Sequence, residues 1–314
     1  MRSRSYPQAL VSLLIIDSQA ANVSWLVFRS HNLGSGMSLT VEQKTNFSGF
    51  PKAGELIEIT GASALEASDR ALLNLLYQHA HGSGRLAIPG ATWEIPMATL
   101  RVSAHESNDR LRESLERLLS IQVNVSYRDT NGRDLVLQTH LFDAFVTPRD
   151  PGTGGGFVRF GVPDALRAVL SQSGRWGRIK AEVVCAMTSK YAMALYELIQ
   201  LRAGLDRCVE QLSLERFRDL LGVPPGKLTR GPDFMRFCVE PAVLEVNGLS
   251  EMGVQIQPVR AHPRAPATGV TLAWWRKEGD EFRAAYAERQ RSKVGRMARL
   301  RGQVEDVQPL KMAL

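Results

Sequence analysis

The segment Leu212–Arg260 constrains the fold most, because it places two helical patterns on either side of a tight turn. Apolar residues at helical spacing predict a short helix over Ser213–Leu221, ended by Gly222. A second helix is predicted over Asp233–Asn247, with these side chains facing inward: Phe234, Phe237, Val243, Leu244 and Val246. Alternating polarity over Val254–Pro258 then predicts a strand. This order is typical of a winged helix-turn-helix, although an ordinary small α+β core element has the same pattern.

The same order of elements occurs earlier in the chain. Ser68 is expected to cap a helix over Asp69–His81, and Ser107 to cap a strongly amphipathic helix over Asn108–Ser120. Polarity alternates over residues 121–141 on both sides of an Asn-Gly pair, which favours a β-hairpin. We therefore predict an α+β fold with two tandem winged-helix domains in pseudo-repeat.

Composition and pattern divide the chain into four parts. Residues 1–50 are an N-terminal lead, 51–175 the first winged-helix domain, 176–280 the second, and 281–314 a basic C-terminal arm. The Gly-rich segment 148–156 is an alternative position for the boundary between the two domains.

Four further elements are expected in the rest of the chain. Residues 51–60 are expected to form a short strand. Phe157–Val162 is predicted to be a strand and Pro163–Leu170 a helix with proline at its first position. Thr188 is expected to cap a long helix over Ser189–Ala203.

The lead has two interpretations. Its basic start and the apolar run Ala9–Ile16 resemble a weak signal peptide, but Pro7 and Asp17 crowd that run. Alternatively, Met37 is the true start, because coherent domain signals begin only near Pro51.

The composition favours an acidic partner and a cytoplasmic location. The 314 residues fit two domains, and the net charge of +7 comes mostly from arginine. Cys185, Cys208 and Cys238 are odd in number and far apart, which suits a reducing compartment better than a disulfide framework or a zinc site. No apolar run approaches the ~18 residues of a membrane span, so no membrane partner is expected.

Three motifs in the second half are specific enough to indicate a family. They are TSKYAMALYELI (188–199), LSLERFRDLLGV (212–223) and DFMRFCVEPAVLEVN (233–247). These motifs resemble the second half of the plasmid replication initiators of the Rep_3 superfamily, which are iteron-binding proteins with tandem winged helices. AGELIEI (53–59) and NDRLRESLERL (108–118) resemble the weaker signals of the first half. The Gly-rich linker and the Gly231-Pro232 pair depart from the family pattern and put the turn geometry in question.

The resemblance implies a protein that binds direct repeats in double-stranded DNA at an origin of replication and helps open the neighbouring duplex. It also implies self-association as a dimer through the first winged helix, repression of its own promoter, and contacts with the host replication initiator and helicase. It implies no cofactor. A winged-helix transcriptional regulator with no role at an origin is the alternative.

The candidate DNA-binding residues of the second domain lie in the turn and at the start of the second helix: Lys227, Thr229, Arg230, Asp233 and Arg236. Arginine can pair with guanine through two hydrogen bonds, so these positions are suited to reading or positioning DNA. Alternatively, Lys227 and Arg230 are solvated loop charges, and Arg236 forms an ion pair with Glu240 one helical turn later.

Two further groups of cations are candidates for contacts with phosphate. Arg110, Arg112 and Arg117 are expected to face outward from the first domain. Acidic residues beside them make a dimer face as plausible as a DNA contact. In the arm, the candidates are Arg289, Arg291, Lys293 and Arg296. They are expected to hold phosphates by releasing counterions, with a purely solubilising tail as the alternative.

Two motifs resemble catalytic sites but lack the length or the geometry that those sites require. The segment 222–227 is one residue too short for a P-loop, and Leu228 replaces the magnesium-binding hydroxyl. His79 and His81 resemble the paired histidines of nicking enzymes, but residues two apart diverge on a helix. We expect no catalytic residue, no metal and no enzymatic activity. A nicking enzyme stays a third interpretation through these two histidines.

Overall fold

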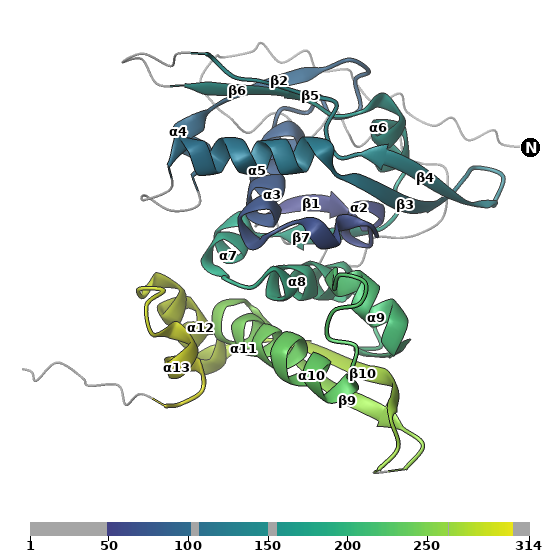
Figure 1. The fold of residues 1–314 in the computed structure, drawn as a ribbon, viewed down its shortest axis with the longest axis vertical. Coiled ribbons are helices and arrows are strands. Elements are labelled where there is room, and N and C mark those ends of the chain that lie inside the picture. The colour runs from purple at the N-terminus through teal and green to yellow at the C-terminus, as the bar shows by residue number, and fades with distance from the viewer. Residues whose placement is uncertain (1–48, 102–106, 150–155, 263, 304–314) are drawn as a thin grey trace, which may run out of the picture. The chain divides into compact units, whose positions relative to one another are not determined.

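The structure, a computed structural model, describes residues 49–101, 107–149, 156–262 and 264–303 (Figure 1). The interpretations of the lead, including a start at Met37, lie outside the described residues. The same holds for residues 304–314 and for most of the Gly-rich segment. Within the described part of the chain, every helix is too short or too polar to span a membrane.

The first half of the chain contains fifteen helices and strands in this order: β1 (Phe50–Ala53), α2 (Gly54–Ile57), η2 (Ala62–Ala64), α3 (Ala67–Gly82), β2 (Thr92–Pro96), α4 (Met97–Leu100), α5 (Asn108–Ser120), β3 (Gln122–Arg128), β4 (Asp134–His140), β5 (Ala144–Val146), β6 (Phe157–Gly161), α6 (Asp164–Ser171), β7 (Trp176–Ile179), α7 (Ala181–Ala186) and α8 (Lys190–Arg202), counted over the described residues. The hairpin β3–β4 and the sheet β2-β6-β5 are antiparallel, and β1 pairs with β7. We call α3, α4, α5 and the β3–β4 hairpin the first module.

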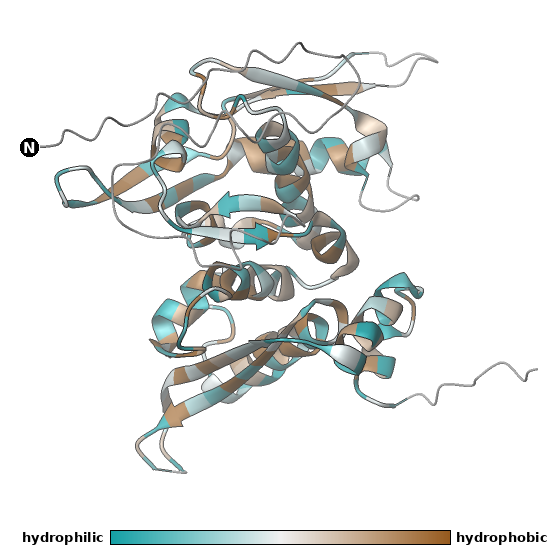
Figure 2. Cartoon of the chain, turned by 180° about the vertical axis from the view of Figure 1, so that it is seen from behind, coloured by the Kyte–Doolittle hydropathy of each residue, from teal (hydrophilic) through white to brown (hydrophobic). Residues whose placement is uncertain are grey.

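The second half continues with nine elements: β8 (Val209–Ser213), α9 (Leu214–Leu221), α10 (Gly231–Phe234), η3 (Met235–Val239), α11 (Glu240–Leu249), β9 (Met252–Arg260), β10 (Ala267–Arg276), α12 (Gly279–Gln290) and α13 (Arg296–Leu300) within the described ranges. The antiparallel sheet has the order β8-β10-β9. Hydrophobic and hydrophilic bands alternate along the β9–β10 hairpin (Figure 2). We call α9 to α11 and this hairpin the second module.

Several sequence predictions are confirmed at the level of single capping residues. Ser107 caps α5 by accepting a hydrogen bond from the Arg110 backbone N–H, as predicted. Ser213, predicted to be the first residue of its helix, instead caps α9 in the same way. Gly222 ends α9 with a φ of 70°, which glycine adopts without a steric penalty. The predicted helix-turn-helix and its wing are therefore present in both modules.

Other local predictions are wrong. Residues 51–60 do not form one strand, because β1 ends at Ala53 and the helical turn α2 follows. Glu66 rather than Ser68 caps α3, in a reciprocal pair of hydrogen bonds with Asp69. Ser189 rather than Thr188 caps α8. In both helices the N-terminus lies within two residues of the prediction.

The second helix of the second module is not continuous as predicted. A π-helical turn, η3, separates α10 from α11. Pro241 has no backbone N–H to bond the carbonyl of Phe237, and the wide turn ends just before it. The extra residue shifts the buried stripe to Phe234, Cys238 and Val239. Phe237, which was predicted to be in the core, is 57% exposed.

Helix α8 joins the elements of the two halves. It packs against β7 and α11, and Tyr196, Leu198 and Ile199 are almost fully buried. The Glu245 carboxylate of α11 accepts hydrogen bonds from the backbone N–H groups of Thr188 and Ser189 just before α8. A negative charge at a helix N-terminus is favourable, so Glu245 anchors α8 to α11. The domain boundary at residue 175 stays a prediction.

Candidate nucleic-acid interface

The turn between α9 and α10 contains three residues whose backbone lies in the left-handed region. Gly222, Gly226 and Leu228 have φ angles of 70°, 75° and 49°. Leu228 is the one non-glycine residue with positive φ among the described residues, and its side chain packs against the core. Core packing therefore holds a backbone conformation that leucine rarely adopts, and it gives the turn a defined path.

Arg218 of α9 braces this turn from inside. Its guanidinium carbon lies 4.7 Å from the centre of the Phe234 ring, and its Nη2 donates a hydrogen bond to the Lys227 carbonyl at 2.5 Å. Phe234 in turn meets Phe217 edge to face, with ring centres 6.0 Å apart. The sequence interpretation missed Arg218, because an arginine on a short amphipathic helix carries no signal that it turns toward a loop.

The predicted DNA-binding residues of the second module lie in this turn and in the helix that follows it. Lys227, Thr229, Arg230 and Arg236 are all exposed. The Arg230 side chain is 79% exposed, and its Nε lies 3.8 Å from the Asp233 carboxylate. Such an exposed pair contributes little to stability, so Arg230 can exchange its partner for a phosphate or a base.

The ion pairs of the described residues do not include one between Arg236 and Glu240, so the alternative interpretation of Arg236 is wrong. Its guanidinium lies over the ring of Phe237, 5.2 Å from the ring centre. Cation–π contacts of this kind are worth ~0.5–1 kcal/mol at exposed sites. Arg236 is therefore oriented by a neighbour without losing its positive charge.

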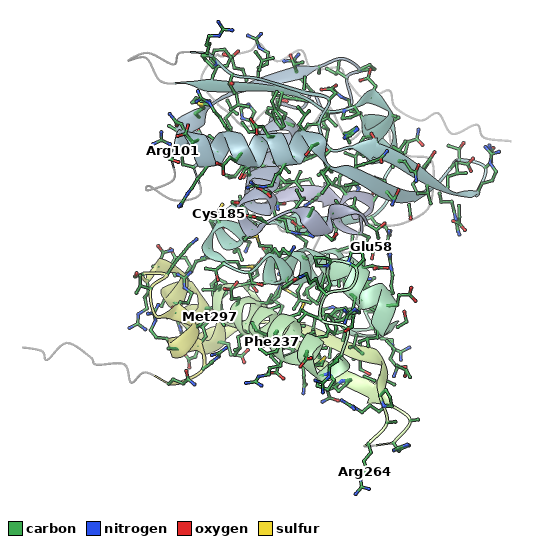
Figure 3. The ribbon with its side chains drawn as sticks, in the orientation of Figure 1. Glu58, Arg101, Cys185, Phe237, Arg264 and Met297 are labelled. Atoms are coloured by element: carbon green, nitrogen blue, oxygen red, sulfur yellow. The ribbon has the colours of Figure 1, made fainter. Side chains whose placement is uncertain are left out.

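The wing of the second module is free of acidic residues. The segment 252–277 contains no Asp or Glu, a signal that the sequence itself carries. At its tip, Arg260 donates a hydrogen bond to the Ala265 carbonyl at 2.7 Å, and Arg264 projects from the end of the hairpin (Figure 3). Lys277 instead points inward and donates to the Ser250 carbonyl, and burial lowers its pKa to about 8. The wing tip is thus the exposed cationic part.

The arginines of α5 have acidic neighbours. Arg110 is exposed, and Arg112 lies 3.8 Å from Asp109. Arg117 was predicted to face outward, but it donates two hydrogen bonds of 2.9 Å to the Asp69 carboxylate. The Asp69 side chain is 0% exposed, so Arg117 compensates a buried charge of α3. Its predicted contact with DNA would require breaking this pair.

The wing of the first module also pairs its arginines. Arg128 lies 2.9 Å from Asp134, and Arg133 lies 2.7 Å from Asp129. Each pair joins neighbouring positions of the β3–β4 hairpin and leaves no net charge. The two wings therefore differ in charge although they share a hairpin architecture.

Two family models match the chain. The model described as "Initiator Replication protein, WH1" matches residues 52–200, and the model described as "Initiator Rep protein, WH2" matches residues 213–267. Together these regions span more than half of the chain. The chain belongs to the Rep_3 superfamily of replication initiators.

The fold of this Rep_3 initiator is similar to that of the Pi initiator protein, whose crystal structure is in complex with iteron DNA. The TM-score is 0.54 at 15% sequence identity, and the similarity covers 73% of this chain and 97% of the other. At this identity the likeness concerns the fold. No curated protein sequence matches the Rep_3 initiator at a significant level.

The C-terminal region of the Rep_3 initiator lies beyond both matched regions and folds into α12 and α13. Arg296, predicted to face DNA, has a side chain that is only 3% exposed. Its Nη1 donates to the Ala186 carbonyl at 2.6 Å, and its Nη2 donates to the Arg291 carbonyl. The predicted phosphate contact needs an exposed guanidinium, whereas this side chain is buried because it satisfies the C-terminal end of α7.

Other cations of the same region are also engaged. Glu288 lies 3.6 Å from Arg291 and 2.7 Å from Arg299. Lys293 donates a hydrogen bond to the Cys185 carbonyl at 2.7 Å, and Arg289 stacks over Tyr286 at 5.1 Å. A count of arginines in the sequence therefore overstates the charge that this region offers to DNA.

The two histidines of the nicking interpretation lie at the end of α3, as predicted. Burial and the nearby Arg178 guanidinium lower the pKa of His81 to about 4. The described residues contain no group of three His, Cys, Asp or Glu side chains placed to hold a metal ion.

Proposed function

We propose that this Rep_3 initiator binds direct repeats (iterons) at an origin of replication, promotes opening of the adjacent duplex and represses its own promoter. The α10–α11 helix reads the major groove and the β9–β10 wing contacts the backbone beside it. The observation that carries the proposal is the exposed, cationic face formed by Lys227, Arg230 and Arg236 next to a wing without acidic residues.

The charge distribution supports a nucleic acid as the ligand. Exposed guanidinium groups on the second helix of a helix-turn-helix match the O6 and N7 acceptors of guanine. Cations at the wing tip match the phosphates of the flanking turn. The Pi initiator protein, which has a similar fold, is in complex with iteron DNA, and this supports the same class of ligand.

Footprinting on the DNA around the gene tests the proposal. We expect protection of tandem direct repeats spaced by about two helical turns, beside an AT-rich segment. Protection of an inverted repeat alone would support the alternative, a transcriptional regulator with no role at an origin. Incubation with supercoiled DNA and a divalent metal is the companion assay, and a site-specific nick would show an enzymatic activity that the proposal does not include.

We also propose that the protein forms a dimer through its first module and contacts the host replication initiator and helicase. The close pair of Arg117 with Asp69 on α5 and the paired charges of the β3–β4 wing support a protein contact there more than a DNA contact. Analytical ultracentrifugation tests the dimer. A purely monomeric protein at all concentrations, or a dimer unaffected by substitutions on α5, would contradict it.

The proposal also includes weaker, sequence-independent contacts between the remaining predicted residues and DNA phosphates. In this proposal Arg110 and Arg112 position phosphates, and Arg289, Arg291 and Lys293 add general affinity if they exchange their present partners for phosphate. Contacts of this kind act on every sequence and weaken as salt rises, by about 0.9 log units of affinity per phosphate and per tenfold salt.

A further inference from the structure

Phe237 lies on the outer face of the second helix of the second module (Figure 3). With 57% of its surface exposed, it is the most exposed phenylalanine among the described residues. Phe234, Cys238 and Val239 on the same helix are buried. The π-helical turn thus directs a large apolar ring away from the core, at the position where a helix-turn-helix meets DNA.

Arg236 and Phe237 act as one unit. The guanidinium lies over the ring at 5.2 Å, so the ring restricts where the donor fork can point. The pair presents two different chemistries side by side, a set of N–H donors and an apolar surface. A base-reading surface needs both, because hydrogen bonds and apolar contacts together distinguish base pairs.

The major groove offers one apolar group on the base edges, the C5-methyl of thymine. Guanine offers the two acceptors that an arginine fork fits. We propose that Phe237 reads the methyl group of a thymine that neighbours a guanine read by Arg236. This inference rests on the proposed function and names the bases that the second module selects.

The surroundings favour DNA over a protein as the partner of this ring. Lys227 and Arg230, in the turn that leads into this helix, are exposed, and the wing that follows has no acidic residue over 252–277. A ring surrounded by positive charge suits a polyanion that carries methyl groups. A protein that covers Phe237 is the other outcome that an experiment must detect.

Modified DNA isolates the methyl group. The full-length wild-type protein first selects its preferred duplex from a randomised library, and this duplex is the probe. Each thymine is then replaced by deoxyuridine, which removes only the C5-methyl. Guanines next to a sensitive thymine are replaced by 7-deazaguanine, which removes the N7 acceptor.

We expect one thymine at which uracil weakens wild-type binding about fourfold, the worth of one buried methyl group. Phe237→Ala should bind the thymine and uracil probes equally at that position, whereas Phe237→Leu should keep the distinction. Arg236→Ala should lose sensitivity to 7-deazaguanine at the neighbouring guanine and keep its sensitivity to uracil.

Phe282→Ala is the matched control, because Phe282 is an exposed phenylalanine of α12 outside this surface. It should behave as the wild type on every probe, and melting curves of all variants should coincide. The inference is overturned if Phe237→Ala distinguishes thymine from uracil as the wild type does, or if no thymine is sensitive in the wild type. A wild-type protein that selects no sequence at all would instead overturn the proposed function.

Discussion

The two modules share an architecture but treat their arginines differently. In the first, Arg117, Arg128 and Arg133 each lie within 2.9 Å of a carboxylate, and one of these carboxylates is buried. In the second, the exposed Arg230 lies 3.8 Å from Asp233, Arg236 lies over an aromatic ring, and Arg264 projects from the wing. In the first module, arginines are therefore largely neutralised by neighbouring carboxylates, whereas in the second module exposed arginines can contact an anionic ligand. Similar numbers of arginine in the sequence conceal this difference.

The largest expected effect concerns the buried carboxylate of the first module. Asp69→Ala should lower the free energy of unfolding by about 3 kcal/mol, near the lower end of the range for breaking a buried pair, because the partner Arg117 is partly exposed. Urea unfolding measures it. The matched control is Asp233→Ala, which removes the partner of exposed Arg230 and should change stability by less than ~0.5 kcal/mol. Equal losses in both variants would erase the contrast between the modules.

The pH dependence of stability gives a second measurement on Asp69. Burial raises its pKa, but hydrogen bonds from Arg117, the Glu66 backbone and Ser114 outweigh burial and hold the pKa below its ordinary value of 3.8. A carboxyl group whose pKa is lower in the folded protein than in the unfolded chain stabilises the fold at pH values above its unfolded pKa. That stabilisation is lost as the pH falls through its folded pKa. Asp69→Asn should therefore flatten the acid limb of the stability curve. An unchanged acid limb would contradict the role of Asp69.

The next effect concerns specific binding by the second module. Arg230→Ala with Arg236→Ala should weaken binding to the repeat by at least about 30-fold, since each guanine contact contributes roughly 1 kcal/mol or more. Binding to random DNA should weaken much less. The matched pair Arg110→Ala with Arg112→Ala removes two exposed or half-exposed arginines of α5. If it lowered specific affinity as much, base reading would not be confined to the second module.

Arg296 tests whether buried arginines of the C-terminal region act on the fold. Arg296→Ala should lower the free energy of unfolding by about 2 kcal/mol, because the carbonyls of Ala186 and Arg291 lose their donor. Thermal unfolding and DNA affinity measured together separate the roles. Arg289→Ala is the control, as that side chain stacks on exposed Tyr286. A stable Arg296→Ala protein with weakened DNA binding would restore the original prediction.

The sequence predicted the helix-turn-helix order of both modules because that order depends on local chemistry. The cap at Ser107 and the helix stop at Gly222 were assigned correctly from their neighbours alone, whereas the predicted caps of α3 and α8 were wrong by one or two residues. The sequence prediction failed where a side chain's position is set by a distant partner or by a change of helical register. Phe237 was misplaced because a π-helical turn shifts the stripe by one residue, and Arg296 because its acceptor lies 110 positions away. Helical periodicity contains neither kind of information.

The smallest expected effect separates local charge from total charge at the wings. Arg260→Ala with Arg264→Ala should reduce the slope of log affinity against log salt by about 1.8, if each arginine neutralises one phosphate. Arg128→Ala with Arg133→Ala lowers the net charge by the same amount, but these arginines are already paired with Asp134 and Asp129. Titrations on random duplex at several salt concentrations measure both slopes. The control should leave the slope nearly unchanged, because paired arginines release few counterions. Two equal reductions would mean that total charge decides, and the comparison between the two modules would then lose its electrostatic basis.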